Sequence, residues 1–285
     1  MNQENNSNSD SSAEKARKIG MLTDVGQVRT VDEDSILAAD LSFGVNSDTS
    51  KFLLLAVADG MGGHAKGEEA SKIALNAIAG AVIPDLLNNT PFTKILEKGI
   101  QNANQDILDY TAKNPEASGM GTTSVCAVVK DNQIHLANVG DSRAYVIGDK
   151  GIRQETKDHS FVQKLVDAGQ LEDSEMETHP RKNELTKALG IGANVEVEVA
   201  EDPILPKSGD KFLMCSDGLC GLVNDLTIEN AINNTVGLDS VNELIQLAEN
   251  AGGNDNISVD IIDIIQSPHS KTIFKDQGNK SLTAT

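Results

Sequence analysis

The chain has 285 residues, and its 43 acidic against 24 basic side chains give a formal net charge of −19. Because 39% of the residues are hydrophobic, the chain can bury a substantial core, which excludes a wholly disordered or fibrous protein. Only 3% of the residues are aromatic, and the strong acidity opposes contact with phosphate backbones, so we expect no nucleic-acid partner. The three cysteines are an odd number in a chain too large to depend on disulfides, and they give no support for an oxidising compartment.

The two ends of the sequence are polar. Residues 1–17 are mostly Asn, Ser and charged side chains, a composition that predicts a disordered tail and excludes a secretory signal. Residues 267–285 form a similar polar tail. The intervening residues 18–266 contain no repeat and no Pro-rich linker, which predicts one compact domain. No apolar run approaches the ~20 residues of a membrane span, so we expect a soluble, cytoplasmic protein and take a monomer as its simplest state.

The apolar pattern alternates between strand-like and helix-like segments. The middle strands follow one another at hairpin distance, with turns at Asp131-Asn132 and Gly148-Asp149, which favours antiparallel sheets with helices packed outside. This order predicts an α+β fold with a layered arrangement. In chain order we predict a strand at 52–58, helices at 68–83 and 92–111, strands at 122–129, 134–139 and 144–147, a helix at 160–168, strands at 195–199 and 212–215, a helix at 241–249 and a strand at 257–265.

Four aspartates share one local context. In each, an apolar run stops at the aspartate, which is flanked by Gly, Ser or Asn. A single Asp-Gly is more often an ordinary turn, but four acids at strand ends point to a common rim. Carboxylates fixed close together repel one another unless a cation neutralises them. All the candidate ligands are oxygens, which favours magnesium or manganese over zinc. The four segments are AVADG with Asp59, ANVGDS with Asp141, LMCSDG with Asp217 and GGNDN with Asp255.

The amino-terminal segment TDVGQVRTVDEDS adds a cation to this acidic set. Arg29 precedes Glu33 by four residues and Asp34 by five, and its planar guanidinium could grip a dianionic phosphate beside a metal. The alternative is an ordinary surface salt bridge with the neighbouring acids, which is the commoner fate of an exposed arginine.

Eight segments in this order resemble the metal-dependent Ser/Thr protein phosphatases of the protein phosphatase 2C family, in its bacterial branch. Together they cover about residues 20–265. The resemblance implies a four-layer α-β-β-α sandwich, in which two antiparallel β-sheets are flanked by helices. The segments are TDVGQVRTVDEDS, LAVADGMGGHAKGEEAS, GMGTTSVCAVV, ANVGDSRAYV, DHSFVQKLVDAG, HPRKNELTKALG, LMCSDGL and GGNDNIS.

The resemblance also implies roles for the acids. Asp59 resembles the carboxylate that bridges two metals, and the carbonyl of Gly60 resembles a ligand of the second. Asp217 and Asp255 resemble further ligands of the first metal, while Asp141, with Asp217, resembles the acid of a third and weaker site. The implied cofactors are two Mn²⁺ or Mg²⁺ ions with a possible third.

Two more acids and the arginine complete the implied site. Glu33 resembles an acid that binds metal through water, Asp34 its neighbour, and Arg29 the phosphate-binding arginine. The implied reaction is hydrolysis of phosphoserine and phosphothreonine in proteins, by a metal-bridging hydroxide that attacks phosphorus in line. The implied partners are phosphorylated proteins, including Ser/Thr kinases.

Some features leave two interpretations open. Met61 stands where many animal relatives have His, so His64 is a candidate general acid for the leaving alcohol, or else it only orients the helix that follows. Residues 158–190 resemble the family's flap beside the active site, although a simple surface helix pair also fits.

Two other functions compete with catalysis of dephosphorylation. The segment GMGGHA after a strand matches a relaxed dinucleotide fingerprint, but Asp59 would repel the pyrophosphate. An inactive phosphoprotein-binding regulatory module of the same fold is the non-enzymatic alternative, and the presence of every recognisable ligand position argues against it.

Overall fold

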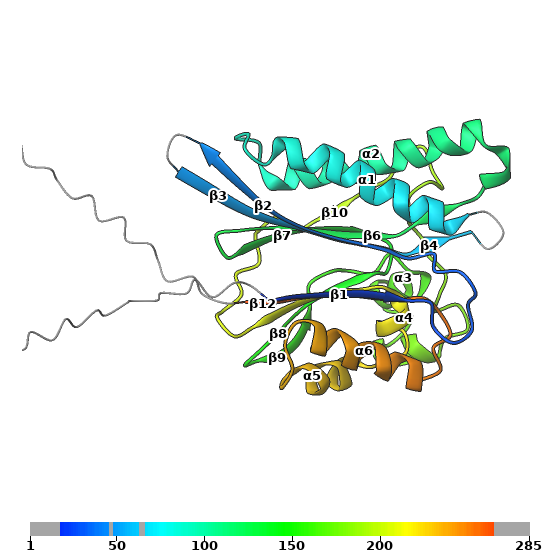
Figure 1. Ribbon diagram of the computed structural model, residues 1–285. Helices are drawn as coiled ribbons and strands as arrows, with labels where there is room; N and C mark the ends of the chain where they lie inside the picture. The colour runs from blue at the N-terminus through cyan, green and yellow to red at the C-terminus, as the bar shows by residue number, and fades with distance from the viewer. Residues whose placement is uncertain (1–17, 46–47, 63–65, 265–285) are drawn as a thin grey trace, which may run out of the picture.

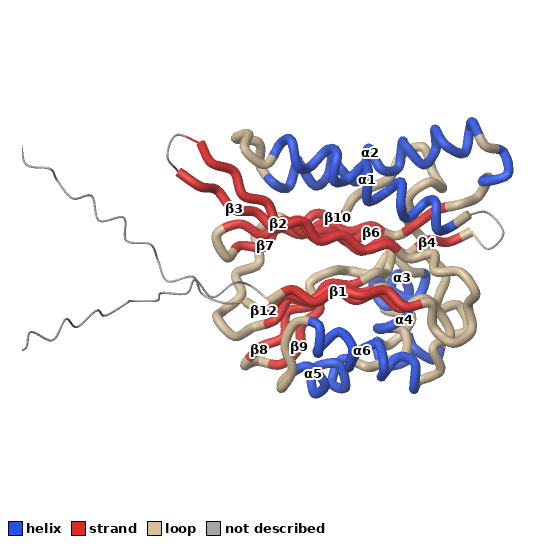
Figure 2. Tube along the Cα trace, viewed as in Figure 1, coloured by secondary structure: helices blue, strands red, loops and turns tan. Residues whose placement is uncertain are grey.

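The computed structural model describes residues 18–45, 48–62 and 66–264. They form two antiparallel five-stranded sheets that lie face to face, with helices on both outer sides (Figures 1 and 2). The expected α+β sandwich with four layers is confirmed. The predicted tails, residues 1–17 and 267–285, lie outside the described residues.

The first sheet has the order β1-β12-β11-β8-β9, and every neighbouring pair is antiparallel. Helices α5 (Asp225–Ile232) and α6 (Leu238–Asn250) cover its outer face (Figure 2). Its strands are β1 (Ile19–Asp24), β12 (Ile257–Asp263), β11 (Lys211–Cys215), β8 (Arg143–Gly148) and β9 (Gly151–Gln154).

The second sheet has the order β10-β7-β6-β3-β2 and is also antiparallel throughout. The long helices α1 (Gly67–Asp85) and α2 (Phe92–Lys113) cover its outer face (Figure 2). A two-stranded ribbon, β4 (Gly60–Met61) with β5 (Gly121–Thr122), extends beside it. The sheet strands are β10 (Glu198–Val199), β7 (Gln133–Val139), β6 (Ser124–Lys130), β3 (Asp48–Ala58) and β2 (Ser35–Val45).

The apolar run of strand β3 is continuous because both faces of the strand are buried. Leu53, Leu55 and Val57 face the other sheet, whereas Leu54 and Ala56 face the helices α1 and α2. Because both faces are covered, every position is apolar and the usual alternation disappears. Three buried clusters result, one between the sheets and one under each pair of outer helices.

Several predicted boundaries differ from the observed ones. The predicted strand at 195–199 is wrong for its first part, because only Glu198–Val199 pairs with β7. The turn between β8 and β9 falls at residues 149–150, one residue later than predicted, since Gly148 still pairs with Gly151. The turn at Asp131-Asn132 is confirmed, with φ of 47° and 62° that suit a tight hairpin.

Several elements are not evident from the sequence pattern. That pattern predicts no strand at β1 or β2 and no helix at α4 (Asp217–Cys220) or α5, and it gives no sign of the short helices η1 (Pro115–Ala117) and η2 (Asp173–Thr178). The predicted helix at 160–168 is observed as α3 (Phe161–Asp167), whose N-cap Ser160 accepts a hydrogen bond from the Gln163 N–H. Within the described residues, no helix combines the length and the apolar character that crossing a bilayer requires.

Candidate active site

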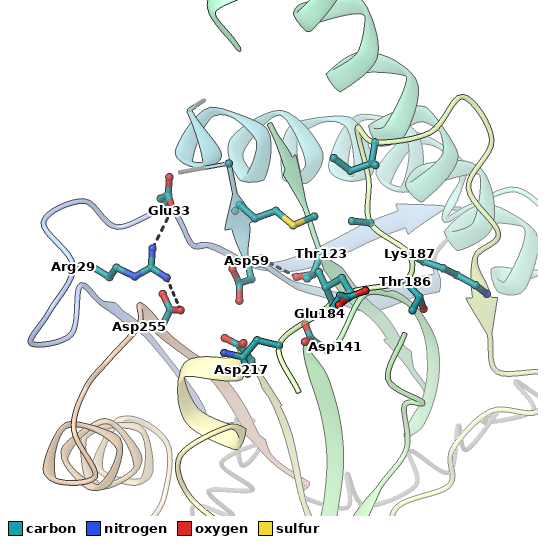
Figure 3. Close-up of a pocket in the computed structure, with 17 residues that line it drawn as sticks. Arg29, Glu33, Asp59, Thr123, Asp141, Glu184, Thr186, Lys187, Asp217 and Asp255 are labelled. Atoms are coloured by element: carbon teal, nitrogen blue, oxygen red, sulfur yellow. Dashed lines mark hydrogen bonds and ion pairs between the residues drawn. The ribbon is translucent and has the colours of Figure 1, made fainter. Parts of the chain in front are cut away.

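The ends of strands from both sheets meet around one pocket of about 600 Å³. Asp59 follows β3, Asp141 follows β7, Asp217 follows β11 and Asp255 precedes β12. Figure 3 shows Asp59, Asp141 and Asp217 turned toward a common space. The structure thus brings seven predicted site residues to one pocket: Arg29, Glu33, Asp59, Gly60, Asp141, Asp217 and Asp255.

Asp34, another predicted site residue, does not line this pocket. Asp34 is buried, and its charge interacts with that of Asp217. His64 lies outside the described residues.

Asp59 is held by Thr122, the last residue of β5, and by Thr123, which lies between β5 and β6. Its backbone N–H donates to Thr123 Oγ1 at 3.0 Å, and its carbonyl accepts from Thr122 Oγ1 at 2.8 Å and from the Thr123 N–H at 2.9 Å. The Thr123 hydroxyl also lies 2.7 Å from Ser142 Oγ, next to Asp141. The bonds fix the backbone that carries two of the carboxylates, which is how a rigid scaffold preorganises a site.

Gly60 joins two acidic segments by a close backbone contact. Its N–H donates to the carbonyl of Glu33 at 3.1 Å. A Cβ at this position would lie 2.2 Å from the Gly67 carbonyl oxygen and 2.3 Å from the Glu33 carbonyl oxygen. Only glycine, which has no Cβ, can be accommodated at this close backbone contact, and this explains why a glycine follows Asp59.

Asn256 holds part of the site together, although the sequence pattern assigns it no role. Its side chain accepts from the Glu33 N–H at 2.9 Å and donates to the carbonyls of Val25 and Val31, each at 3.0 Å. One buried amide therefore ties the segment carrying Arg29 and Glu33 to the start of β12. The available signal was an Asn directly after Asp255 at the edge of an apolar strand.

Arg29 forms ion pairs with neighbouring acids and also lines the pocket, so the salt-bridge and phosphate-binding interpretations are compatible. Its Nη2 lies 2.8 Å from Asp255 Oδ2, and its Nη1 lies 3.9 Å from Glu33 Oε2. The side chain remains 44% exposed and reaches the pocket from its rim (Figure 3). It forms surface ion pairs, and those pairs place its donors at the pocket.

Burial and mutual repulsion raise the pKa values of the clustered acids. Burial, then the neighbouring charges of Asp34 and Asp217, raises the pKa of Asp59 well above its usual value. Burial and then Asp217 raise the pKa of Asp141 to about 8. Burial raises the pKa of Asp34 to about 7, and burial followed by Asp255 raises that of Asp217. These shifts mean that burial, and then repulsion between the carboxylates, makes their charged forms unfavourable in the folded protein unless a cation lies beside them.

The donor set fits a hard divalent cation. The converging groups are carboxylate oxygens and one backbone carbonyl, and raised pKa values of this kind are relieved when a cation binds. Among the residues that the structure describes, no three His, Cys, Asp or Glu side chains already stand in the arrangement of a metal cage. The evidence that the pocket suits a divalent cation is therefore the oxygen chemistry of its donors and the repulsion between its carboxylates.

Residues 183–188 form one wall of the pocket. The Thr186 N–H donates to the His159 carbonyl at 2.7 Å, and the Gly140 N–H donates to His159 Nδ1 at 3.1 Å. His159 therefore lies between this wall and the turn that carries Asp141. Lys187 extends away from the carboxylates toward Glu196, at 2.7 Å (Figure 3).

Comparisons with known proteins agree with this arrangement. The family model for protein phosphatase 2C matches residues 35–258, so the chain belongs to the protein phosphatase 2C family. It is 36% identical over 244 residues to the serine/threonine phosphatase stp of Listeria innocua, covering 85% of this chain and 93% of that protein.

Solved structures agree as well. The structure of the serine/threonine phosphatase PstP/Ppp of Mycobacterium tuberculosis matches with a TM-score of 0.77 and 34% identity, over 88% of this chain and 99% of that one. The catalytic domain of PstP in complex with two manganese ions matches with a TM-score of 0.73 and 33% identity, over the same shares of the two chains.

Proposed function

We propose that this protein is a metal-dependent serine/threonine phosphatase that hydrolyses phosphoserine and phosphothreonine in proteins. The single observation that carries the proposal is the convergence of four strand-end aspartates and Arg29 on one pocket. The family relationship supports the same function, because the relatives at about 35% identity are serine/threonine phosphatases. Since the acid positions are all present, the catalytic function is preferred over an inactive phosphoprotein-binding module.

Asp59, Asp141, Asp217, Asp255 and the carbonyl of Gly60 would hold the metal ions, for which manganese or magnesium is the proposed identity. Glu33 would act through water, with Asp34 behind it. When bound, such cations lower the pKa of a water molecule and neutralise charge on the phosphoryl oxygens.

The chain's own residues supply binding and orientation. Arg29 presents a planar pair of N–H donors at the rim, where it would bind two oxygens of the phosphate in one orientation. Thr122 and Thr123 hold the Asp59 backbone, so the position of its carboxylate changes little during the reaction. His64 is the proposed proton donor to the leaving alcohol, with orientation of α1 as its alternative role.

The remaining proposals concern partners and surroundings. The proposed substrates are phosphorylated proteins, including Ser/Thr kinases, and the proposed state is a cytoplasmic monomer that binds no nucleic acid. Residues 158–190 are proposed as the flap beside the active site, because residues 183–188 line the pocket.

The test of the proposed function is release of inorganic phosphate from a phosphothreonine peptide with added Mn²⁺. We expect release that EDTA abolishes and that Asp217→Ala reduces by about 10²- to 10³-fold, a loss typical of removing one electrostatic group from an active site. The matched control is Glu201→Ala, which removes an exposed carboxylate outside the pocket and should retain full activity. Activity that survives chelation would contradict the metal-dependent reaction.

A further inference from the structure

An isoleucine is held in an exposed position on the rim of the catalytic pocket. Ile191 lines this pocket, yet 59% of its surface is exposed. Exposed apolar residues are common on proteins and need no explanation by themselves. The backbone around Ile191 is, however, fixed by three sets of contacts, which come from helix α2, from Met120 and from strand β5.

The first contact comes from Asn104 on α2, which is only 3% exposed. Its Oδ1 accepts from the Gly190 N–H at 2.8 Å, and its Nδ2 donates to the Gly192 carbonyl at 2.9 Å. One buried amide therefore grips the backbone on both sides of Ile191. Both the oxygen and the nitrogen of the Asn104 amide form hydrogen bonds, so the amide fixes the orientation as well as the position of this backbone segment.

The second contact comes from the packing of Gly190, which has φ of +81°. A Cβ there would lie 2.4 Å from Ile107 Cγ2 and 3.0 Å from the Met120 carbonyl oxygen. The third contact is the pairing of Leu189 with Thr122 of β5, through hydrogen bonds of 2.9 and 3.2 Å. These contacts hold residues 189–192 against the body of the protein, so the Ile191 side chain stays at the rim.

Ile191 does not stand alone there. Met61 Cε and Ile191 Cδ1 both lie close to Gly121, at 3.1 and 3.0 Å from the position of a Cβ on that residue. Leu185 and Ala188 line the same pocket. We call these four side chains, Met61, Leu185, Ala188 and Ile191, the apolar shelf.

The apolar shelf is continuous with the proposed phosphate site. Met61 is two residues beyond Asp59, and at ~3.3 Å per residue of extended chain its Cα lies at most about 7 Å from the Asp59 Cα; both residues line the pocket. An extended substrate peptide has the same spacing, so a side chain one to three residues from the phosphothreonine would reach the shelf.

We propose that the apolar shelf binds an aliphatic side chain of the substrate, within three residues of the phosphorylated one, and that Asn104 positions Ile191 for this contact. The inference rests on the proposed phosphatase function and adds a substrate class to it. A flexible thioether beside a fixed isoleucine accommodates isoleucine, leucine, valine or methionine without selecting one shape. A polar side chain would displace water from methyl groups and gain no hydrogen bond there.

The experiment compares phosphothreonine peptides that differ in one residue, isoleucine or serine, placed in turn at each position from three before to three after the phosphothreonine. We expect the wild-type kcat/KM to be about 5- to 10-fold higher for isoleucine at one or more of these positions, in line with the value of a few methylene contacts. Ile191→Ser should reduce this ratio to about 1, and Ile191→Leu should restore most of it. Asn104→Ala should reduce the ratio as well. Asn104→Asp keeps the acceptor for the Gly190 N–H, so it should reduce the ratio less than Asn104→Ala does.

The matched control is Leu205→Ser, which removes an isoleucine-sized side chain that is 69% exposed and lies outside the pocket. It should leave both the ratio and the overall activity unchanged. Equal kcat/KM for the isoleucine and serine peptides at every position, with clear phosphate release from both, would overturn the shelf and leave the phosphatase function standing. A preference that persists in Ile191→Ser would also overturn it. Release from neither peptide would overturn the proposed function and the shelf with it.

Discussion

Arg29 and Asp255, which are 226 residues apart in the sequence, meet at the pocket rim with 2.8 Å between Nη2 and Oδ2. The pair keeps the guanidinium at the mouth of the pocket. It also engages a carboxylate that we assign to metal binding, so Arg29 would exchange this partner for phosphate when the site is filled. The guanidinium is partly exposed, which keeps the cost of that exchange small.

We therefore predict that Arg29→Ala mainly weakens substrate binding. The loss of charge-assisted hydrogen bonds to phosphate should raise KM by about 10- to 100-fold, with a smaller effect on kcat. Arg29→Lys should fall between, because it keeps the charge but loses the planar pair of donors. Steady-state kinetics on one phosphopeptide measure both constants, and an unchanged KM would place the arginine outside the phosphate site.

A second prediction concerns Gly60, whose Cβ would collide with two backbone carbonyls. Gly60→Ala should move the segment that follows Asp59 and reduce kcat by about 100-fold, the effect expected from a displacement near 1 Å. Gly80→Ala is the matched control, because Gly80 lies in α1 and a Cβ there would have no atom from elsewhere in the described chain within 4 Å. That control should keep full activity and stabilise the helix by about 0.5–1 kcal/mol. Equal activity of the two variants would show that the close backbone contact at Gly60 is not needed for activity.

The sequence predicted the buried parts of the fold well because covered strands and long helices have strong patterns. Strand β3 and helix α2 are clear from their apolar residues alone, and the strand-end aspartates are visible as acids after apolar runs. Edge strands are harder to predict. Strand β1 mixes Gly20, Thr23 and Asp24 with apolar residues, so neither period dominates, and its pairing with β12 depends on residues far along the chain.

The site was predictable in its acids but not in the groups that hold them. Asn256, Thr123 and Asn104 act through hydrogen bonds to backbone atoms of distant segments. Nothing in their local sequence distinguishes them from other polar residues, because the partner is chosen by the tertiary fold. The same reasoning applies to the ion pair of Arg29 with Asp255, since the two residues come close only after folding.

Asp260 is a further residue that local pattern could not interpret, and it gives the third prediction. It lies within the apolar strand β12 and is 1% exposed, and neither of its carboxylate oxygens has a hydrogen-bond partner among the described residues. Its paired neighbours are Met21 and Met214. Burial alone raises the pKa of Asp260 from 3.8 to about 8.

The folded protein therefore keeps a proton on Asp260 that the unfolded chain loses near its ordinary pKa. Stability from this proton is fully present below pH ~4 and falls by about 1.4 kcal/mol per pH unit until the folded carboxyl ionises near pH 8. Asp260→Asn, which cannot ionise, should be more stable than the wild type by a margin that grows with pH across this window. Urea unfolding with EDTA from pH 5 to 8 measures the margin, and Asp202→Asn, an exposed change, is the control. A margin that does not vary with pH would contradict the assignment.

The last prediction concerns an ion pair at the end of β11 and β12 away from the pocket. Lys211 and Asp263 are nearly buried; Lys211 Nζ also donates to the Thr235 carbonyl at 2.6 Å, and Asp263 Oδ2 accepts from the Gly237 N–H at 2.9 Å. Lys211→Met leaves a buried carboxylate without its cation and should cost about 3–5 kcal/mol of unfolding free energy. The double variant Lys211→Met with Asp263→Leu should cost less than the sum of the two single changes, because it removes both charges together. Urea unfolding of the four proteins measures this coupling, and strictly additive losses would show that the two charges do not stabilise each other.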